Sequence, residues 1–243
     1  MSTELDPKKV LLTIQTLERR IEERFPSSGL GDVCRQLLAV CNACKEKAEW
    51  IARPNYFLRA GIALVILLSI IILAYGIPKI EVSVDGRIAV GELVQVVDAA
   101  LNNLVLLGAA IFFLVTFEVR IKRNRALNAL HELRTIVHVI DMHQLTKDPG
   151  KLTEEVIYTP SSPKSEMTSY ELMRYLDYCS EMLSLTGKIA ALYGQSFHDS
   201  VVVVAVNDIE NLTTGLARKI WQKIMIIHLL NDGPERKSLL DSG

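Results

Sequence analysis

The sequence predicts an all-α membrane protein with two transmembrane helices, a cytoplasmic helical bundle and a small extracytoplasmic β-hairpin-like loop. Three observations support this fold class. Apolar residues make up 49% of the 243 residues and charged residues only 23%, and the mean hydropathy is positive, although a soluble domain needs a polar surface. The excess apolar residues lie in two uncharged blocks. Elsewhere, apolar residues recur at helical spacing.

The composition and motifs argue against several classes of protein. The 27 basic and 28 acidic residues give a net charge of −1, so we expect no nucleic acid partner. Four cysteines are too few for a disulfide scaffold. The chain contains no Walker loop and no G-x-G-x-x-G, G-x-S-x-G or H-E-x-x-H motif, which disfavours an enzyme. No cofactor is therefore expected.

Two uncharged blocks are long enough to cross a bilayer. The first covers residues 60–78 and the second residues 99–117, where Asn102 is one of two adjacent asparagines. About 20 apolar residues in a helix span the hydrocarbon layer of roughly 30 Å. A core helix of a soluble protein is rarely so long and apolar on every face. We therefore expect transmembrane helices at 55–78 and 99–119.

Charged residues beside the blocks predict the orientation. Four basic residues precede the first block and four follow the second: Lys45, Lys47, Arg53, Arg59, Arg120, Lys122, Arg123 and Arg125. The segment 79–98 between the blocks has two cations and four acids. The positive-inside rule then places both termini in the cytoplasm of a plasma or inner membrane, and 79–98 outside. Alternating residues around Asp85-Gly86 predict the hairpin in this loop.

The cytoplasmic segments are expected to be helical. Residues 1–54 contain two helices, the first beginning at Asp6-Pro7 and ending at Pro26. No glycine or proline lies between Gly108 and Pro149, so the second crossing should continue as one helix with an apolar seam. That helix leads into a cytoplasmic helical domain at 120–232, within which residues 146–167 form a linker rich in proline, serine, threonine and charge.

The last part of the chain predicts two more helices. Thr168 and Glu171 match a capping box at the start of the first. The second opens with a β-branched run at 201–206, which could form a strand, but helix is favoured because no partner strand is evident. We expect residues 233–243 to be a flexible tail.

Two charged stripes predict an ionic layer between helices. One stripe would lie on the long cytoplasmic helix and the other on the helix after the linker: His131, Arg134, His138 and Asp141, and Arg174, Asp177, Glu181 and Lys188. Such a layer would fix the register of the bundle more than it would stabilise it. The alternative is a metal-binding or proton-transfer site built on the histidines and acids.

Two further groups of residues are candidates for a site. The cysteines Cys34, Cys41, Cys44 and Cys179 could form a zinc site, but three of them fall on an apolar stripe, where free cysteine acts as a small hydrophobe. Gln95, Asp98 and Asn102 recur at helical spacing near the outer end of the second crossing. Polar groups at this depth face a partner helix or water, so these three residues could line a pore. The alternative is that Asp98 lies in the headgroup layer and Asn102 forms a hydrogen bond with another helix.

The resulting functional hypothesis is a homo-oligomeric, two-pass membrane protein that forms a pore or scaffold gated or organised by its cytoplasmic bundle. Its partners would be the lipid bilayer and other copies of the chain. Alternatives are a membrane-anchored metal sensor or enzyme, and an accessory tether for a cytoplasmic protein. The order of segments is similar to that of the SLATT group, bacterial two-transmembrane effector domains of conflict systems. This likeness is one of layout and implies no role for any residue.

Overall fold

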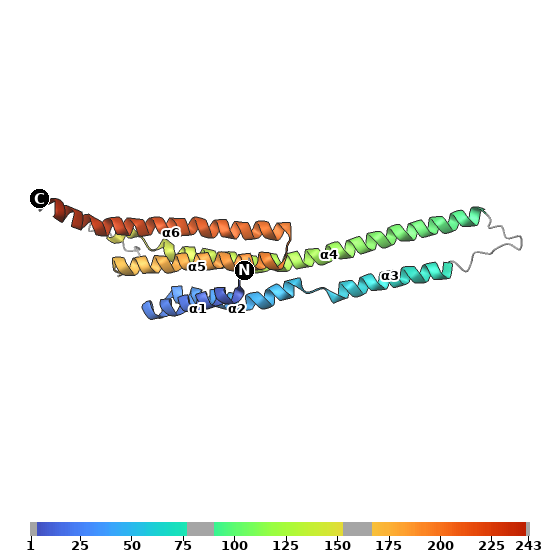
Figure 1. The fold of residues 1–243 in the computed structure, drawn as a ribbon, viewed down its shortest axis with the longest axis horizontal. Coiled ribbons are helices and arrows are strands. Elements are labelled where there is room, and N and C mark those ends of the chain that lie inside the picture. Colours follow the sequence, from blue (N-terminus) through green and yellow to red (C-terminus); the bar gives the residue numbers. More distant parts are fainter. Residues whose placement is uncertain (1–3, 77–89, 153–166, 242–243) are drawn as a thin grey trace, which may run out of the picture. The chain divides into compact units, whose positions relative to one another are not determined.

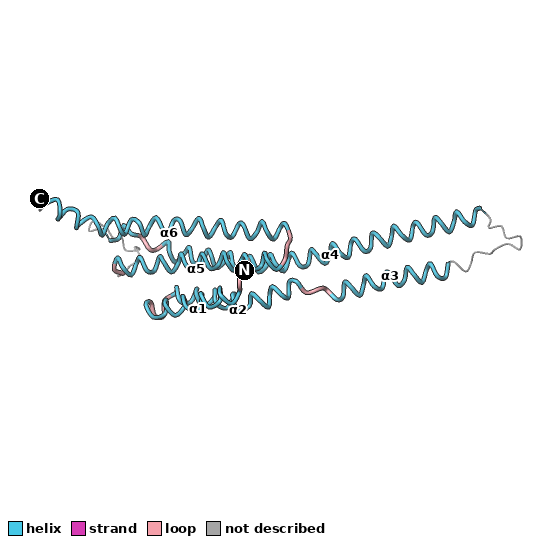
Figure 2. Tube along the Cα trace, viewed as in Figure 1, coloured by secondary structure: helices cyan, strands magenta, loops and turns pink. Residues whose placement is uncertain are grey.

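A computed structural model describes residues 4–76, 90–152 and 167–241. The described residues form α-helices and one short 3-10 helix and contain no strand, which confirms the all-α prediction for this part of the chain (Figures 1 and 2). In chain order the elements are α1 (Pro7–Arg24), α2 (Gly29–Ala52), α3 (Tyr56–Gly76), α4 (Val90–Leu145), η2 (Pro149–Leu152), α5 (Ser169–Ser196) and α6 (Ser200–Asp241).

Two predicted segments fall largely outside the described residues. Of the predicted hairpin loop at 79–98, only residues 90–98 are described, and they are helical because α4 begins at Val90. This stretch contains no proline, the residue that most strongly disfavours a helix. Of the predicted linker at 146–167, residues 146–152 and 167 are described, and Pro149–Leu152 form the short 3-10 helix η2.

The chain divides into two compact units. One comprises residues 1–52 together with 125–243, and the other comprises residues 53–124. The first unit is the predicted helical bundle, and it contains α1, α2, α5, α6 and the last part of α4. The second unit contains α3 and the earlier part of α4.

Two helices of the bundle, α1 and α5, begin where the sequence predicts. The Asp6 carboxylate accepts a hydrogen bond from the Lys8 backbone N–H (2.9 Å), and Pro7 occupies the first turn of α1. At the start of α5, the Thr168 hydroxyl accepts from the Glu171 N–H, and the Glu171 carboxylate accepts from the Thr168 N–H. This reciprocal pair is the predicted capping box.

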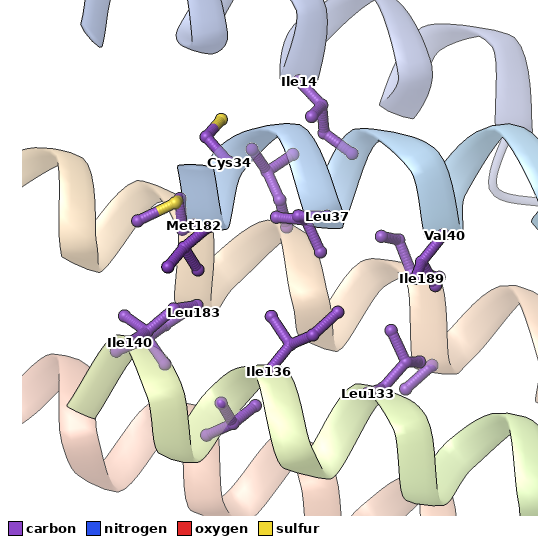
Figure 3. Packing of buried hydrophobic residues seen from close by; sticks show 14 of the residues in the cluster. Ile14, Cys34, Leu37, Val40, Leu133, Ile136, Ile140, Met182, Leu183 and Ile189 are labelled. Atoms are coloured by element: carbon purple, nitrogen blue, oxygen red, sulfur yellow. The ribbon is translucent and has the colours of Figure 1, made fainter. Parts of the chain in front are cut away.

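One apolar core joins the helices of the bundle. The predicted seam of α4 is buried and consists of Ala126, Ala129, Leu130, Leu133, Ile136, Val137 and Ile140. Figure 3 labels Leu133, Ile136 and Ile140 of this seam. They lie in the same core as side chains of α1, α2 and α5, including Ile14, Leu37 and Leu183. Apolar burial of this kind is the main source of free energy that holds helices together.

A tight connection links α5 to α6, and the two helices lie close together. The Asp199 carboxylate accepts hydrogen bonds from the N–H groups that open α6. Residues 201–206 are helical, as predicted. A side-chain carbon added at Gly187 of α5 would lie only 3.2 Å from the Thr213 hydroxyl of α6, so glycine permits this approach. The helix α6 continues past Gly233 to Asp241, where the sequence predicts a tail.

The end of α4 is capped by a lysine from α6. The Lys223 ammonium donates to the Gln144 carbonyl (2.7 Å), to the Gln144 side-chain oxygen (2.7 Å) and to the Lys147 carbonyl (3.1 Å). The Gln144 carbonyl lies in the last turn of α4, at the negative end of the helix dipole, and it also accepts a hydrogen bond from the Lys147 N–H (3.1 Å). Burial lowers the pKa of Lys223, although the nearby carboxylates of Asp148 and Asp141 act in the opposite direction.

Candidate functional site

The unit at 53–124 exposes the apolar surface that the sequence predicts to cross a bilayer. The helix α4 is long and apolar enough to do so, and none of its most apolar stretch is buried. On this helix Leu106 is 69% exposed and Phe112 is 74% exposed. The described apolar part of α3, Tyr56–Ile72, is shorter, and it too exposes large apolar side chains such as Leu67. Such a surface is stable only against lipid or protein.

Polar side chains interrupt the apolar surface at two places. The buried Ser69 hydroxyl of α3 donates a hydrogen bond to the Asn103 side-chain oxygen of α4 (3.1 Å). This contact joins the two helices of the unit. The second place holds the predicted pore-lining residues Gln95, Asp98 and Asn102, which are exposed in the single chain. Among them, the Asn102 amide donates to the Asp98 carboxylate at 3.4 Å.

A charged group lies at the end of the uncharged block of α4. The Glu118 carboxylate is 2.9 Å from the Lys122 ammonium and 3.9 Å from the Arg59 guanidinium, and its side chain is 14% exposed. The second contact joins α3 to α4. Sequence analysis identifies Arg59 and Lys122 only as charges that flank the two uncharged blocks, and it gives no sign that Arg59 and Glu118 pair.

The first predicted charged stripe lies on an open face of α4. His131 and His138 are exposed. The Arg134 guanidinium is 3.7 Å from the Asp208 carboxylate of α6, and both side chains are about half exposed. The Asp141 carboxylate accepts from the Gln144 amide of its own helix. None of these contacts reaches the second predicted stripe.

The second predicted stripe lies on α5 and faces α1 rather than α4. Glu181 accepts two hydrogen bonds from the Arg20 guanidinium of α1, at 2.8 and 3.1 Å. Within α5, Arg174 pairs with Asp177 (2.7 Å), and Lys188 donates to Ser184 (2.7 Å). The structure therefore does not bring the two stripes together, because α5 presents apolar residues, such as Leu183, to the core that it shares with α4.

Arginine and tyrosine side chains meet where α1 ends and α5 begins. The guanidinium carbons of Arg20 and Arg174 each lie 5.1 Å from the centre of the Tyr178 ring, and that of Arg24 lies 5.3 Å from the Tyr170 ring. Burial opposes ionisation of Tyr178, yet hydrogen bonds from Arg174 and Arg24 outweigh it and lower the pKa of the hydroxyl. Spacing on one helix could not reveal this cluster, because two helices contribute to it.

The four cysteines are buried and form no disulfide bond. Burial raises the pKa of Cys34 and Cys179 to about 12 and that of Cys41 and Cys44 to about 11. Among the described residues, no three histidine, cysteine or acidic side chains are grouped so that they could hold a metal ion. These thiols therefore pack as small apolar side chains within the core.

Comparisons of the chain with protein-family models, with curated proteins and with solved structures gave no match.

Proposed function

We propose that the chain is a two-pass integral membrane protein that assembles with copies of itself, and that its cytoplasmic bundle gates or organises a transmembrane pore or scaffold. The observation that carries the proposal is the continuity of α4. This single helix of 56 residues includes both the exposed apolar stretch and a buried seam of the bundle core. A change in bundle packing would therefore act on the same helix that meets the lipid.

The first crossing, predicted at 55–78, is assigned to α3. Its apolar residues are exposed, and its contact with α4 through Ser69 and Asn103 is of the kind that joins helices within a bilayer. The basic residues beside the two apolar blocks favour an interior location for both chain ends.

Assembly is supported by the polar residues near the start of α4. Gln95, Asp98 and Asn102 are spaced three and four residues apart, so they share one helix face, and all are exposed. In lipid, such groups require either a partner helix or water. A second copy of the chain would supply the helix, and a ring of copies would enclose the water.

The proposal is tested by mass and flux measurements on the purified full chain. After the mass of empty nanodiscs is subtracted, mass photometry should give at least twice the 27.1 kDa of one chain, and a strict monomer would contradict assembly. In liposomes, ion flux should exceed that of protein-free controls and fall in N102L, while V105L, an exposed apolar exchange on the same helix, should keep it. Flux no greater than that of protein-free controls would exclude a pore. The mass measurement would then be the test of whether the chain assembles as a scaffold.

A further inference from the structure

The bundle contains a cleft that the proposed membrane assembly does not use. The cleft lies between the last turns of α1 and the first turns of α5 and has a volume of about 580 Å³. Clefts that bind small molecules usually have volumes of roughly 300–1,000 Å³. Three arginines, Arg20, Arg24 and Arg174, and two tyrosines, Tyr170 and Tyr178, line it.

The aromatic residues hold the arginines of the cleft in place. Tyr178 is only 2% exposed, and the edge of its ring meets Phe25, with ring centres 6.2 Å apart. Arg20 and Arg174 both lie against this fixed ring. Guanidinium groups held against aromatic rings are already ordered, so less conformational entropy is lost when they bind a ligand.

The side chains that line the cleft carry one more positive charge than negative charge. Its walls include two carboxylates, Glu23 and Glu171, against the three arginines. The Glu171 carboxylate already accepts from both the N–H and the hydroxyl of Thr168, at 2.8 and 2.9 Å. In the described part of the chain no carboxylate lies within ion-pair distance of Arg24, although its charge helps to lower the pKa of Glu171. Its guanidinium lies over the 55% exposed ring of Tyr170 and also donates to the Tyr178 hydroxyl.

The other two arginines have carboxylate partners outside the cleft walls. Arg20 pairs with Glu181 and Arg174 pairs with Asp177, and the side chains of both pairs remain between about a quarter and two fifths exposed. A guanidinium carries five N–H donors, so one carboxylate does not use all of them. Arg20 and Arg174 therefore keep donors that can face the cleft.

We propose that this cleft binds a small, soluble, phosphate-bearing molecule. Arg24 would be the principal contact, and Arg174 would be the second. The fork of a guanidinium matches two oxygens of a phosphate group, which gives short, charge-assisted hydrogen bonds. The positive end of the dipole of α5 lies at the same place and favours negative charge. The exposed Tyr170 ring offers a stacking surface to a planar group on the same ligand.

The competing interpretation is that the cluster only clamps α1 to α5. Both interpretations predict that loss of an arginine lowers stability, so stability alone does not separate them. A shift of the thermal midpoint on addition of ligand separates the two interpretations, because a cluster that only clamps the helices gives no response to phosphate. This proposal concerns binding alone and does not depend on whether the assembly conducts.

The test uses the full chain in nanodiscs of phosphatidylcholine, which supply no anionic headgroup, at low ionic strength. The probes are sodium pyrophosphate and ATP without divalent cations, the first to test phosphate alone and the second to add a planar ring. The thermal midpoint is read from tryptophan fluorescence, since both tryptophans, Trp50 and Trp221, belong to the bundle unit. Equilibrium dialysis with labelled ATP measures the dissociation constant directly.

We expect one or both probes to raise the midpoint of the wild type, and added salt to reduce the effect. R24Q should weaken binding by at least about tenfold, because it removes a charged donor. R174Q should weaken it to a similar extent. The matched control is R19Q, which removes the same charge from an exposed position next to Arg20, outside the cleft. It should bind as the wild type does.

Two outcomes would overturn the proposal. One is a wild-type protein whose midpoint and dialysis show no response to either probe. The other is a failure of the cleft variants to differ from the control. In that case R24Q and R174Q bind as tightly as the wild type, or R19Q binds as weakly as R24Q and R174Q do. Circular dichroism before addition of the probe establishes that each variant is folded, so a lost response is assigned to the cleft.

Discussion

Replacement of Leu133 by alanine tests whether the last part of α4 belongs to the bundle core. Leu133 is fully buried in the seam of α4 (Figure 3). Alanine has a slightly higher helix propensity than leucine, so a loss of stability cannot come from the helix itself. It must come from the apolar contacts that the side chain makes with other helices.

The size of the loss follows from the burial. Removing about three buried carbon groups at roughly 0.8 kcal/mol each gives a transfer contribution of about 2.4 kcal/mol. The cavity left behind adds to this contribution, and buried leucine-to-alanine changes cost about 2–5 kcal/mol in total. We therefore expect the free energy of unfolding of L133A to fall by about 3 kcal/mol.

The assay is urea unfolding of the detergent-solubilised chain, followed by tryptophan fluorescence. Both tryptophans lie in the bundle unit, so the signal reports on the bundle. M142A is the matched control because Met142 is on the same helix and 66% exposed. It should change the free energy by less than about 0.5 kcal/mol. A loss below about 1 kcal/mol in L133A, or an equal loss in M142A, would refute the placement of α4 in the core.

Three other predictions concern the bundle. G215A should stabilise it by about 0.5–1 kcal/mol in urea unfolding, because the added carbon meets open space, whereas G187L should destabilise it strongly by pushing α5 away from α6. A double-mutant cycle on Arg20 and Glu181 should give a coupling free energy of at most about 1 kcal/mol, since both side chains are more than a third exposed. A much larger coupling free energy would show that solvent does not screen the pair. The four buried thiols should react slowly with iodoacetamide at pH 8, because their pKa values of about 11 to 12 leave little thiolate. Unfolding in urea should restore the ordinary reaction rate. Rapid reaction of the native protein would contradict the burial of the thiols.

The helices could be predicted from the sequence because their signals are local. Asp6 with Pro7, and Thr168 with Glu171, begin α1 and α5 where short-range hydrogen bonding requires. The apolar seam of α4 could also be predicted, because helical spacing alone determines which residues share a face.

The pairing of charges could not be predicted in the same way. Periodicity shows that Glu181 lies on one stripe with Arg174, but not which neighbouring helix that stripe meets. In the structure the stripe meets Arg20 of α1, because the other faces of α5 carry apolar residues that pack in the bundle core. Helical spacing could not predict the arginine–tyrosine cluster for the same reason, because Arg24 and Tyr178 come from helices far apart in the sequence.

Topology mapping with single introduced cysteines tests the central claim most directly. S83C lies in the segment expected outside, and T135C lies on an exposed face of α4 within the bundle unit. The native cysteines are buried, so they contribute little background. With a membrane-impermeant maleimide, the account predicts that intact cells label S83C at once and T135C only after permeabilisation. Labelling of T135C in intact cells, or of both positions only after permeabilisation, would contradict a two-pass protein with an interior bundle.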